Sequence, residues 1–202
     1  MKIKLVLLAI LYILATSSFA AANPFDDASA AYERGDYVQA VKVFRQLAEQ
    51  GHQWAQRRVG SMYAEGKGVP QDYQEAVKWF RLAAEDGNAP AQSSLGLAYE
   101  KGQGVPQNYQ EAMKWYRLAA AQGDPTAQIH LGVMYSNGDG MRKDFARAHM
   151  WFSLAAAANS GDFAVMAAKH RDSLAAKMTA EEIATAHEMA QRCRESKLKS
   201  CD

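Results

Sequence analysis

Cysteine, an excess of charge of one sign and long apolar runs are all scarce in this sequence of 202 residues. Its 2 cysteines are too few for a disulfide-stapled scaffold or a four-ligand zinc module. The 23 Lys and Arg balance 22 Asp and Glu to a formal net charge of +1, without the basic excess typical of nucleic-acid-binding proteins. A mean hydropathy of -0.34 excludes a protein built from many membrane spans. Composition therefore indicates a soluble globular protein and leaves its chemistry open.

Sequence motifs for catalysis and metal binding are also missing. There is no H-E-x-x-H pair, no G-x-S-x-G elbow and no C-x-x-C pair. The histidines stand singly, at His52, His130, His149, His170 and His187. Gly66-Lys67-Gly68 is a glycine loop, but no strand precedes it and no Lys-Ser or Lys-Thr follows it, so we interpret it as a turn between helices. We therefore predict no catalytic residue, no metal site and no cofactor.

Residues 1–22 have the pattern of a secretory signal peptide. A positive start is followed by an apolar run from Leu5 to Leu14 and then by small residues, and we expect cleavage after Ala20 or Ala22. A retained membrane anchor is the alternative, but the run is shorter than the roughly 20 residues that span a bilayer. After cleavage, the protein is expected without a transmembrane domain, in the periplasm or outside a bacterial cell.

Export would place Cys193 and Cys201 in a compartment where disulfides persist. A bridge between them would close a short loop and pin the C-terminal tail rather than hold the fold together. Two unpaired cysteines, or cysteines in mixed disulfides, are the alternative.

The strongest pattern is internal repetition with a period of 36 residues, shown by Trp79, Trp115 and Trp151. The same interval separates Gly60, Gly96 and Gly132; Tyr63, Tyr99 and Tyr135; Gly66, Gly102 and Gly138; and Leu82, Leu118 and Leu154. A period of this length is typical of solenoid proteins, in which each repeat buries its apolar face only by stacking on its neighbours.

Each repeat is predicted to contain two helices. The second helix begins after an N-cap residue, which is Asp72, Asn108 or Asp144. Glu75 and Glu111 stand three residues later, where a carboxylate completes a capping box, and Gly87 and Gly123 end these helices. The first helix carries a central glycine in all three repeats, which predicts a contact too close for a side chain.

These residues resemble the Sel-1-like repeat, a relative of the tetratricopeptide repeat. The shared pattern is A-x4-G-x2-Y-x2-G-x-G-V-P-x-[DN]-Y-x2-A-x2-W-[FY]-x-L-A-A, and it covers residues 55–87, 91–123 and 127–159. The third repeat departs from it at Met141-Arg142-Lys143, where the others have Val-Pro-Gln. The resemblance implies an all-α, right-handed superhelical solenoid of antiparallel helix pairs.

The segments outside these three repeats complete the predicted organisation. Ala31–Gly51 has the shorter spacing of a tetratricopeptide unit, and Thr179-x-x-Glu182 predicts a capping box for a last helix. The predicted divisions are a signal peptide at 1–22, a tetratricopeptide-like unit at 23–52, three Sel-1-like repeats at 53–160, and capping helices with a tail at 161–202.

The resemblance also implies a non-enzymatic adaptor that holds a protein or peptide partner in a concave groove. Positions that vary between the repeats are free to contact a partner, whereas constant positions build the stack. On the first helices these variable positions include Trp54, Arg57, Ser93, Leu97, Glu100, Ile129 and Val133. The alternative for any one of them is packing on a neighbouring helix. No nucleic-acid partner is expected.

Two other functions remain open at this point. Cysteine-rich exported members of the family are linked to penicillin binding or β-lactam hydrolysis, but they carry paired cysteines within each repeat, which this chain lacks. The other is binding of peptidoglycan or another glycan, with Trp and Tyr side chains stacking on sugars.

Overall fold

The computed structural model describes residues 23–158, 161–199 and 201, and within them it contains ten helices and no strand. Residues 1–22, where the signal peptide is predicted, lie outside the described residues. The helices are α2 (Pro24–Glu33), α3 (Tyr37–Glu49), α4 (Gln53–Glu65), α5 (Tyr73–Glu85), α6 (Ala89–Lys101), α7 (Tyr109–Ala120), α8 (Pro125–Asn137), α9 (Phe145–Ala158), α10 (Asp162–Ala175) and α11 (Ala180–Glu195).

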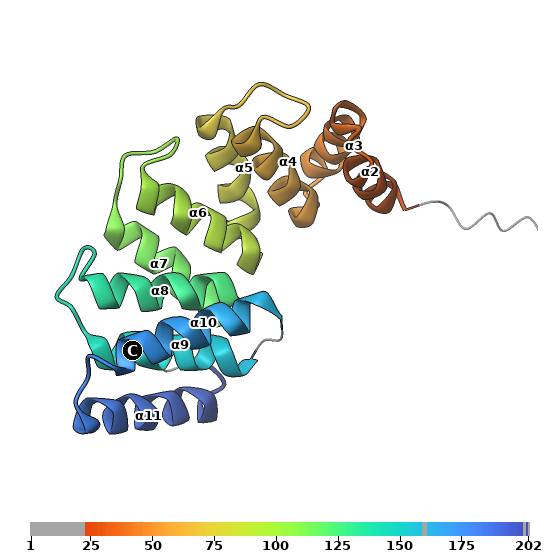
Figure 1. Cartoon of the computed structure of the whole chain (residues 1–202). Coiled ribbons are helices and arrows are strands. Elements are labelled where there is room, and N and C mark those ends of the chain that lie inside the picture. Colours follow the sequence, from red (N-terminus) through yellow and green to blue (C-terminus); the bar gives the residue numbers. More distant parts are fainter. Residues whose placement is uncertain (1–22, 159–160, 200, 202) are drawn as a thin grey trace, which may run out of the picture.

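The helices follow one another along a curved path, and neighbours in sequence from α2 to α10 pack side by side (Figure 1). We term α2, α4, α6, α8 and α10 the A helices, and α3, α5, α7 and α9 the B helices. This arrangement confirms the predicted solenoid of antiparallel helix pairs.

The predicted helix ends are largely confirmed. Side-chain oxygens of Asp72, Asn108 and Asp144 accept the backbone N–H three residues on, at 3.0, 3.1 and 2.8 Å. Gly87 and Gly123 both have φ of +86°, which is the left-handed conformation expected directly after a helix. Local sequence signals therefore place the starts and ends of the B helices.

The capping boxes predicted at Glu75 and Glu111 are wrong, because the N–H groups of Asp72 and Asn108 donate to backbone carbonyls instead. The carboxylate of Glu75 does not reach back to its N-cap, but accepts a hydrogen bond from the indole Nε1 of Trp79 at 3.1 Å. The indole N–H is partly buried one turn further along the helix, where it would otherwise lack an acceptor. Glu111 likewise forms an ion pair further along its own helix. The box between Thr179 and Glu182 is present as predicted.

The central glycines of the A helices leave room for an aromatic ring from the following B helix. A Cβ atom added at Gly60, Gly96 or Gly132 would lie 2.7, 2.8 or 2.5 Å from a ring atom of Phe80, Tyr116 or Phe152, respectively. These distances are far below a normal van der Waals contact. The predicted close contact is therefore confirmed.

Buried glutamines join successive repeats, a feature that the sequence analysis did not single out. Each side-chain Nε2 donates to a backbone carbonyl at the end of the preceding B helix: Gln56 to Ala48, Gln92 to Ala84 and Gln128 to Ala120, at 3.3, 3.1 and 3.4 Å. Since a buried amide must be hydrogen-bonded to avoid a large desolvation cost, this contact fixes how one repeat meets the next.

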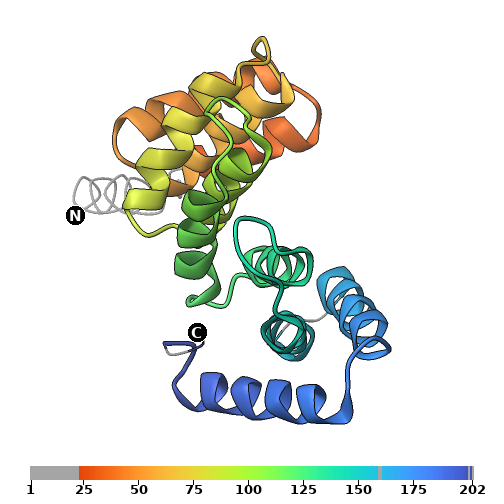
Figure 2. The same ribbon diagram turned by 90° about the vertical axis from the view of Figure 1, so that its left-hand side faces the viewer.

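The last two helices both pack on α9, on different sides of it, rather than chiefly on one another (Figure 2). The effect is visible at one repeat position. Leu82 and Leu118 on α5 and α7 are 47% and 45% exposed, whereas Leu154 on α9 is 2% exposed. The face of α9 that carries Leu154 is therefore covered in the packed C-terminal region, whereas the same face is open on the earlier B helices.

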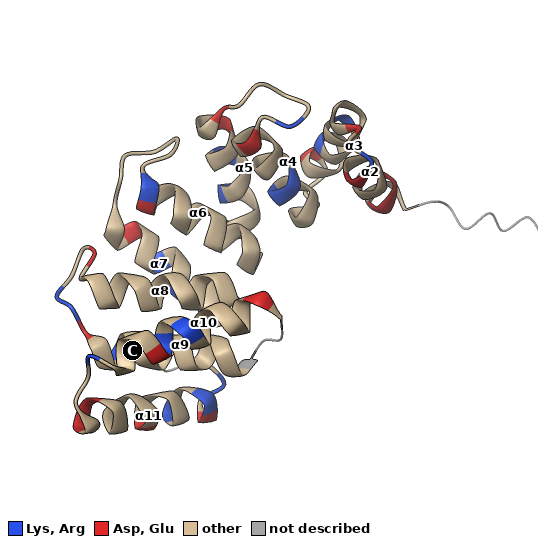
Figure 3. Ribbon diagram, in the orientation of Figure 1, with Lys and Arg blue, Asp and Glu red and all other residues tan. Residues whose placement is uncertain are grey.

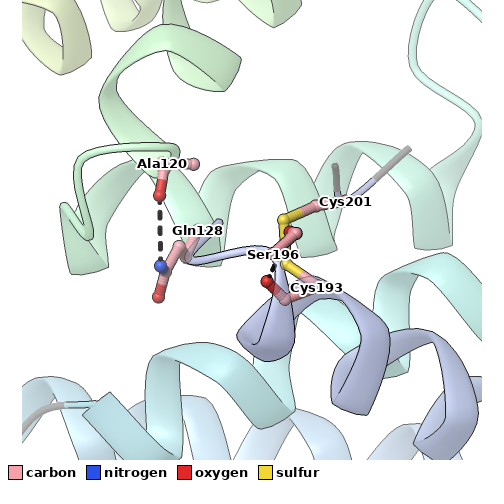
Figure 4. Close-up of a disulfide and its surroundings, with 5 residues drawn as sticks. All are labelled: Ala120, Gln128, Cys193, Ser196 and Cys201. Atoms are coloured by element: carbon pink, nitrogen blue, oxygen red, sulfur yellow. Dashed lines mark hydrogen bonds between the residues drawn. A yellow bond between two sulfur atoms is a disulfide. The ribbon is translucent and has the colours of Figure 1, made fainter. Parts of the chain in front are cut away.

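A disulfide between Cys193 and Cys201 holds the tail against the end of α11 (Figure 4). Cys193 is fully buried, and Leu198 between the two cysteines donates its backbone N–H to the Cys193 carbonyl at 2.9 Å. The Leu198 side chain packs on the C-terminal core and reaches the turn at Gly123. Of the two alternatives left by the sequence, the structure thus contains the paired form.

Candidate partner-binding groove

All seven residues predicted to contact a partner lie on three A helices, α4, α6 and α8. These helices stack in order along the solenoid, and α6 contacts α8 directly. The structure does not bring the seven side chains together as one exposed surface. It divides them into one exposed residue, three partly exposed residues, two buried residues and one residue within a hydrogen-bonded cluster.

Trp54 and Arg57 form the most accessible part of the predicted set. The Trp54 side chain is 47% exposed, although an indole usually contributes strongly to a core. Arg57 is half-buried, and its Nε is buried without a hydrogen-bond partner among the described residues. Burial lowers the pKa of Arg57, the neighbouring Arg58 lowers it further, and Asp124 opposes the change. Those guanidinium N–H groups of Arg57 that reach the surface can donate hydrogen bonds to a partner's carbonyl or carboxylate oxygen.

Ser93 and Ile129 are buried, so they contact the chain itself rather than solvent. Ser93 is 5% exposed, and its hydroxyl donates to Asp124 Oδ1 at 2.6 Å. Asp124 is also the N-cap of α8 and accepts the N–H of Ala127 at 2.8 Å. Ile129 is 7% exposed within the C-terminal core. Ser93 and Ile129 occupy the same repeat position as Arg57, and in these two repeats that position packs within the chain.

Glu100 belongs to a cluster that joins α6, α7 and α8. Its Oε2 accepts the Tyr116 hydroxyl at 2.8 Å and lies 2.9 Å from His130 Nδ1, while Oε1 lies 3.0 Å from Lys101 Nζ. The Tyr116 and His130 rings stack with centroids 4.9 Å apart. Burial raises the pKa of Glu100, but the hydrogen bonds from His130 and Tyr116 outweigh it and hold this pKa at about 2. Burial, followed by the Glu100 charge, raises the pKa of Tyr116.

Glu100 is predicted from the sequence as a partner-contact residue, with packing on a neighbouring helix as the alternative, and no sequence pattern links it to Tyr116 or His130. The three residues are 16 and 30 positions apart along the chain. A signal was available, because relative to the preceding repeat two of the three positions gain a polar group and the third changes from a serine to a histidine. Simultaneous polar changes at positions that share one interface indicate a hydrogen-bonded cluster.

Leu97 and Val133, which occupy the same repeat position, are both partly exposed and pack on the edge of the C-terminal core. Leu97 also lines a cavity of about 180 Å³ between α4, α5 and α6. Together with Trp54 and Arg57, these two side chains make up the accessible part of the predicted groove, which we term the A-helix face.

The glycine loops have a packing role. A Cβ atom added at Gly68 or Gly104 would lie 2.3 or 2.1 Å from the backbone oxygen of Tyr37 or Tyr73, at the start of the preceding B helix. Each loop therefore lies directly on the neighbouring repeat, and its second glycine is needed for that approach. This agrees with a turn between helices rather than a phosphate-binding loop.

Positively and negatively charged residues are not segregated along the described helices. Lys and Arg are interspersed with Asp and Glu from α2 to α11 (Figure 3). Among the described residues, no group of three or more His, Cys, Asp or Glu side chains could hold a metal ion. None of the helices in the described part of the chain has the length and apolarity needed to cross a membrane.

In this structure each helix pair contacts mainly its neighbours, and the same glutamine hydrogen bond recurs between successive pairs. This arrangement defines an α-solenoid repeat protein. The sequence model of the Sel1 repeat matches residues 29–52, 55–88, 89–124 and 125–160, more than half of the chain. The chain therefore belongs to the Sel1 repeat family, within the tetratricopeptide-like superfamily. Proteins of this family are helical-repeat scaffolds that typically mediate protein–protein interaction.

Two solved structures support this assignment. A Sel1 repeat protein from Oxalobacter formigenes is 36% identical, with a TM-score of 0.63 over 68% of this chain and 55% of that one. The protein c5321, a protective antigen of uropathogenic Escherichia coli strains with an SLR fold, is 28% identical, with a TM-score of 0.57 over 80% of this chain and 44% of that one. The chain thus spans about half the length of these relatives. No curated protein matches it.

Proposed function

We propose that this protein is an exported, non-enzymatic scaffold that holds a protein or peptide partner along its A-helix face. The observation that carries the proposal is the 47% exposure of the Trp54 indole, which lies one turn from the half-buried Arg57 on α4. Trp and Arg are the residue types most enriched among those that dominate binding energy at protein interfaces. A rigid helix face of this kind suits an amphipathic helix or an extended peptide.

Two features support export to the cell envelope or beyond. The predicted signal peptide precedes the repeats, and the Cys193–Cys201 disulfide is a bond that persists in oxidising compartments. A related chain is described as a protective antigen, and an exposed location would suit that role. Fusion of the first 22 residues to a reporter that is active only in the periplasm tests this part of the proposal.

Photo-crosslinking in intact cells tests the binding surface. A crosslinking amino acid placed at Leu97 should capture a discrete partner, and Trp54→Ala with Arg57→Ala should reduce that capture at least about ten-fold, as expected for residues of this type. The melting temperature of the double variant should stay within a few degrees of the original, because Trp54 is 47% exposed.

The matched control is Leu82→Ala with Leu118→Ala, which truncates two exposed side chains on the B helices. This variant should retain capture. If it loses capture while the Trp54 and Arg57 variant keeps it, the partner binds the B helices and the A-helix face is the wrong surface. Unfolding of the Trp54 and Arg57 variant would show that these residues are structural.

A further inference from the structure

A cavity between α4, α5 and α6 opens on the A-helix face. Its volume is about 180 Å³, and its lining combines apolar side chains, among them Val77, Phe80 and Leu97, with polar ones such as Ser94 and Glu65. An apolar cavity of about 150 Å³ is large enough to hold benzene, so this space is on the scale of one large side chain. The lining residues come from two neighbouring A helices and the B helix between them, so the cavity lies between successive turns of the solenoid.

The repeats provide an internal comparison for this space. One repeat later, Ala64 is replaced by Glu100, Phe80 by Tyr116 and Ser94 by His130. Those three larger or more polar side chains form the hydrogen-bonded cluster between α6, α7 and α8, in which Tyr116 is fully buried. The chain therefore fills the second site with its own side chains and leaves the first site open.

The aromatic ring at the base of each site shows the same difference. His130 stacks on Tyr116 with centroids 4.9 Å apart, and His170 stacks on Phe152 at 5.2 Å. Among the described residues, no ring stacks on Phe80. Ser94, at the position of His130, instead donates to the carbonyl of Pro90 in its own helix at 2.9 Å. Accordingly α4 and α6 contact each other less than α6 and α8 do.

We propose that this cavity, which we term the anchor pocket, receives one large uncharged apolar side chain of the partner, such as Phe, Leu or Met. The inference rests on the proposed function and names the chemistry of the partner's main contact. The open position above Phe80 suits an aromatic or branched side chain. Glu65 at the rim is already paired with Lys67 at 2.7 Å, so it offers no unpaired charge to a cationic side chain.

Amide NMR titration with blocked amino acids tests the pocket without a known partner. N-acetyl-phenylalaninamide and N-acetyl-leucinamide should shift the backbone signals of Ala64 and Ala98, which line the pocket. N-acetyl-alaninamide should bind at least about ten-fold more weakly because it buries less apolar surface. N-acetyl-lysinamide should also bind at least about ten-fold more weakly, because its charged ammonium group would lose hydration. Equal binding of all four compounds, or shifts elsewhere on the chain, would overturn the proposal.

A variant that copies the next repeat provides the sharpest test. Ala64→Glu with Phe80→Tyr and Ser94→His should fill the pocket and abolish the shifts, while thermal melting shows that the protein is folded. The matched control, Glu100→Ala with Tyr116→Phe and His130→Ser, opens the second site by giving it the residues of the first. It should keep the shifts at Ala64 and Ala98 and add new shifts near Ala112, beside the opened site. If the filling variant does not fold, Ser61→Leu with Ala98→Met fills the same space with the residues found at Leu97 and Met134.

The result also separates this inference from the proposed function. If a filled pocket no longer binds the blocked amino acids but the partner is still captured at full strength, the anchor pocket is not where the partner inserts a side chain, and the scaffold function stands. If capture depends on neither the pocket nor Trp54 and Arg57, the A-helix face itself is not the binding surface.

Discussion

Gly96 has no side chain because the Tyr116 ring occupies the space beside it. An added Cβ would lie 2.8 Å from that ring, and the equivalent glycines face Phe80 and Phe152 in the same way. At the scale of single residues, the repeat therefore requires a small residue on one helix and a large ring on the next. The ring is part of a B helix, so this contact sets how closely the two helices of a repeat approach.

Gly96→Ala tests this contact. In an open helix the change would stabilise the protein by about 1 kcal/mol, but overpacking against Tyr116 costs about 1–3 kcal/mol. We expect a net decrease of up to about 2 kcal/mol in the free energy of unfolding, measured by urea denaturation. Ser94→Ala on the same helix is the control, with a change within about 0.5 kcal/mol. A raised midpoint for Gly96→Ala would show that the ring moves aside freely.

Glu100 is expected to make the protein sensitive to acid. Its pKa is about 2 in the folded protein, against an ordinary value of 4.5. Because the folded-state pKa is the lower one, the cluster contributes stability above pH 4.5 and loses it progressively as the pH falls toward 2. The difference of about 2.5 pKa units corresponds to at most about 3 kcal/mol.

Denaturation midpoints between pH 6 and pH 2 measure this loss. Glu100→Gln should be less stable at pH 6 and should show a flatter dependence below pH 4.5, since the titrating carboxyl is gone. Glu75→Gln, which changes a carboxyl outside the cluster, is the control and should keep the slope of the original protein. Identical slopes for Glu100→Gln and the original protein would contradict the assignment.

At the scale of elements, the C-terminal helix α11 differs from the B helices before it. It packs on α9, the last B helix, and is tied to its own tail by the disulfide. A solenoid needs an atypical end, because the last repeat has no following neighbour to cover its apolar face. Here the chain ends with α11, which returns to pack on α9.

Removing the disulfide should weaken this end and leave the rest intact. Cys193→Ala with Cys201→Ala opens a loop that spans a sequence separation of 8, and the expected cost is roughly 2 kcal/mol. Amide hydrogen exchange should become faster in α11 and the tail, with no change in α2 to α6. Faster exchange throughout the chain would show that the bridge supports the whole fold rather than its end.

At the scale of the whole molecule, the described residues form three separate apolar clusters along the solenoid axis. The first involves α2 to α4, the second is centred on α5 and α6, and the third extends from α7 to α11. Stability in such a stack is approximately a sum of local terms and nearest-neighbour terms. A defect in one cluster should therefore stay largely local.

Phe44→Ala tests this expectation. Phe44 is fully buried in the first cluster, and its truncation should cost about 3–5 kcal/mol there. Hydrogen exchange should lose protection in α2 to α4 and keep it in α8 and α9. Met150→Ala, in the third cluster, should give the reverse pattern. Equal loss of protection in all helices for both variants would indicate a single cooperative unit.

Much of the fold followed from local patterns. The N-caps at Asp72, Asn108 and Asp144, the left-handed glycines and the 36-residue period each act within one repeat, so they can be read without knowing the tertiary contacts. The capping prediction for Glu75 was wrong because Trp79, on the same helix, offers its carboxylate another donor. That outcome depends on side-chain burial, which the cap motif does not encode.

The sequence by itself determined the family, the helix pairs and the helices on which variable residues lie, because repetition and capping are properties of neighbouring residues. Only the tertiary structure decided which of those residues remain accessible. Ser93 and Ile129 are covered, Glu100 is held by Tyr116 and His130, and Trp54 and Leu97 retain exposed surface. Exposure depends on side chains brought together from about 30 positions away, and that approach is set by how each repeat stacks on the next.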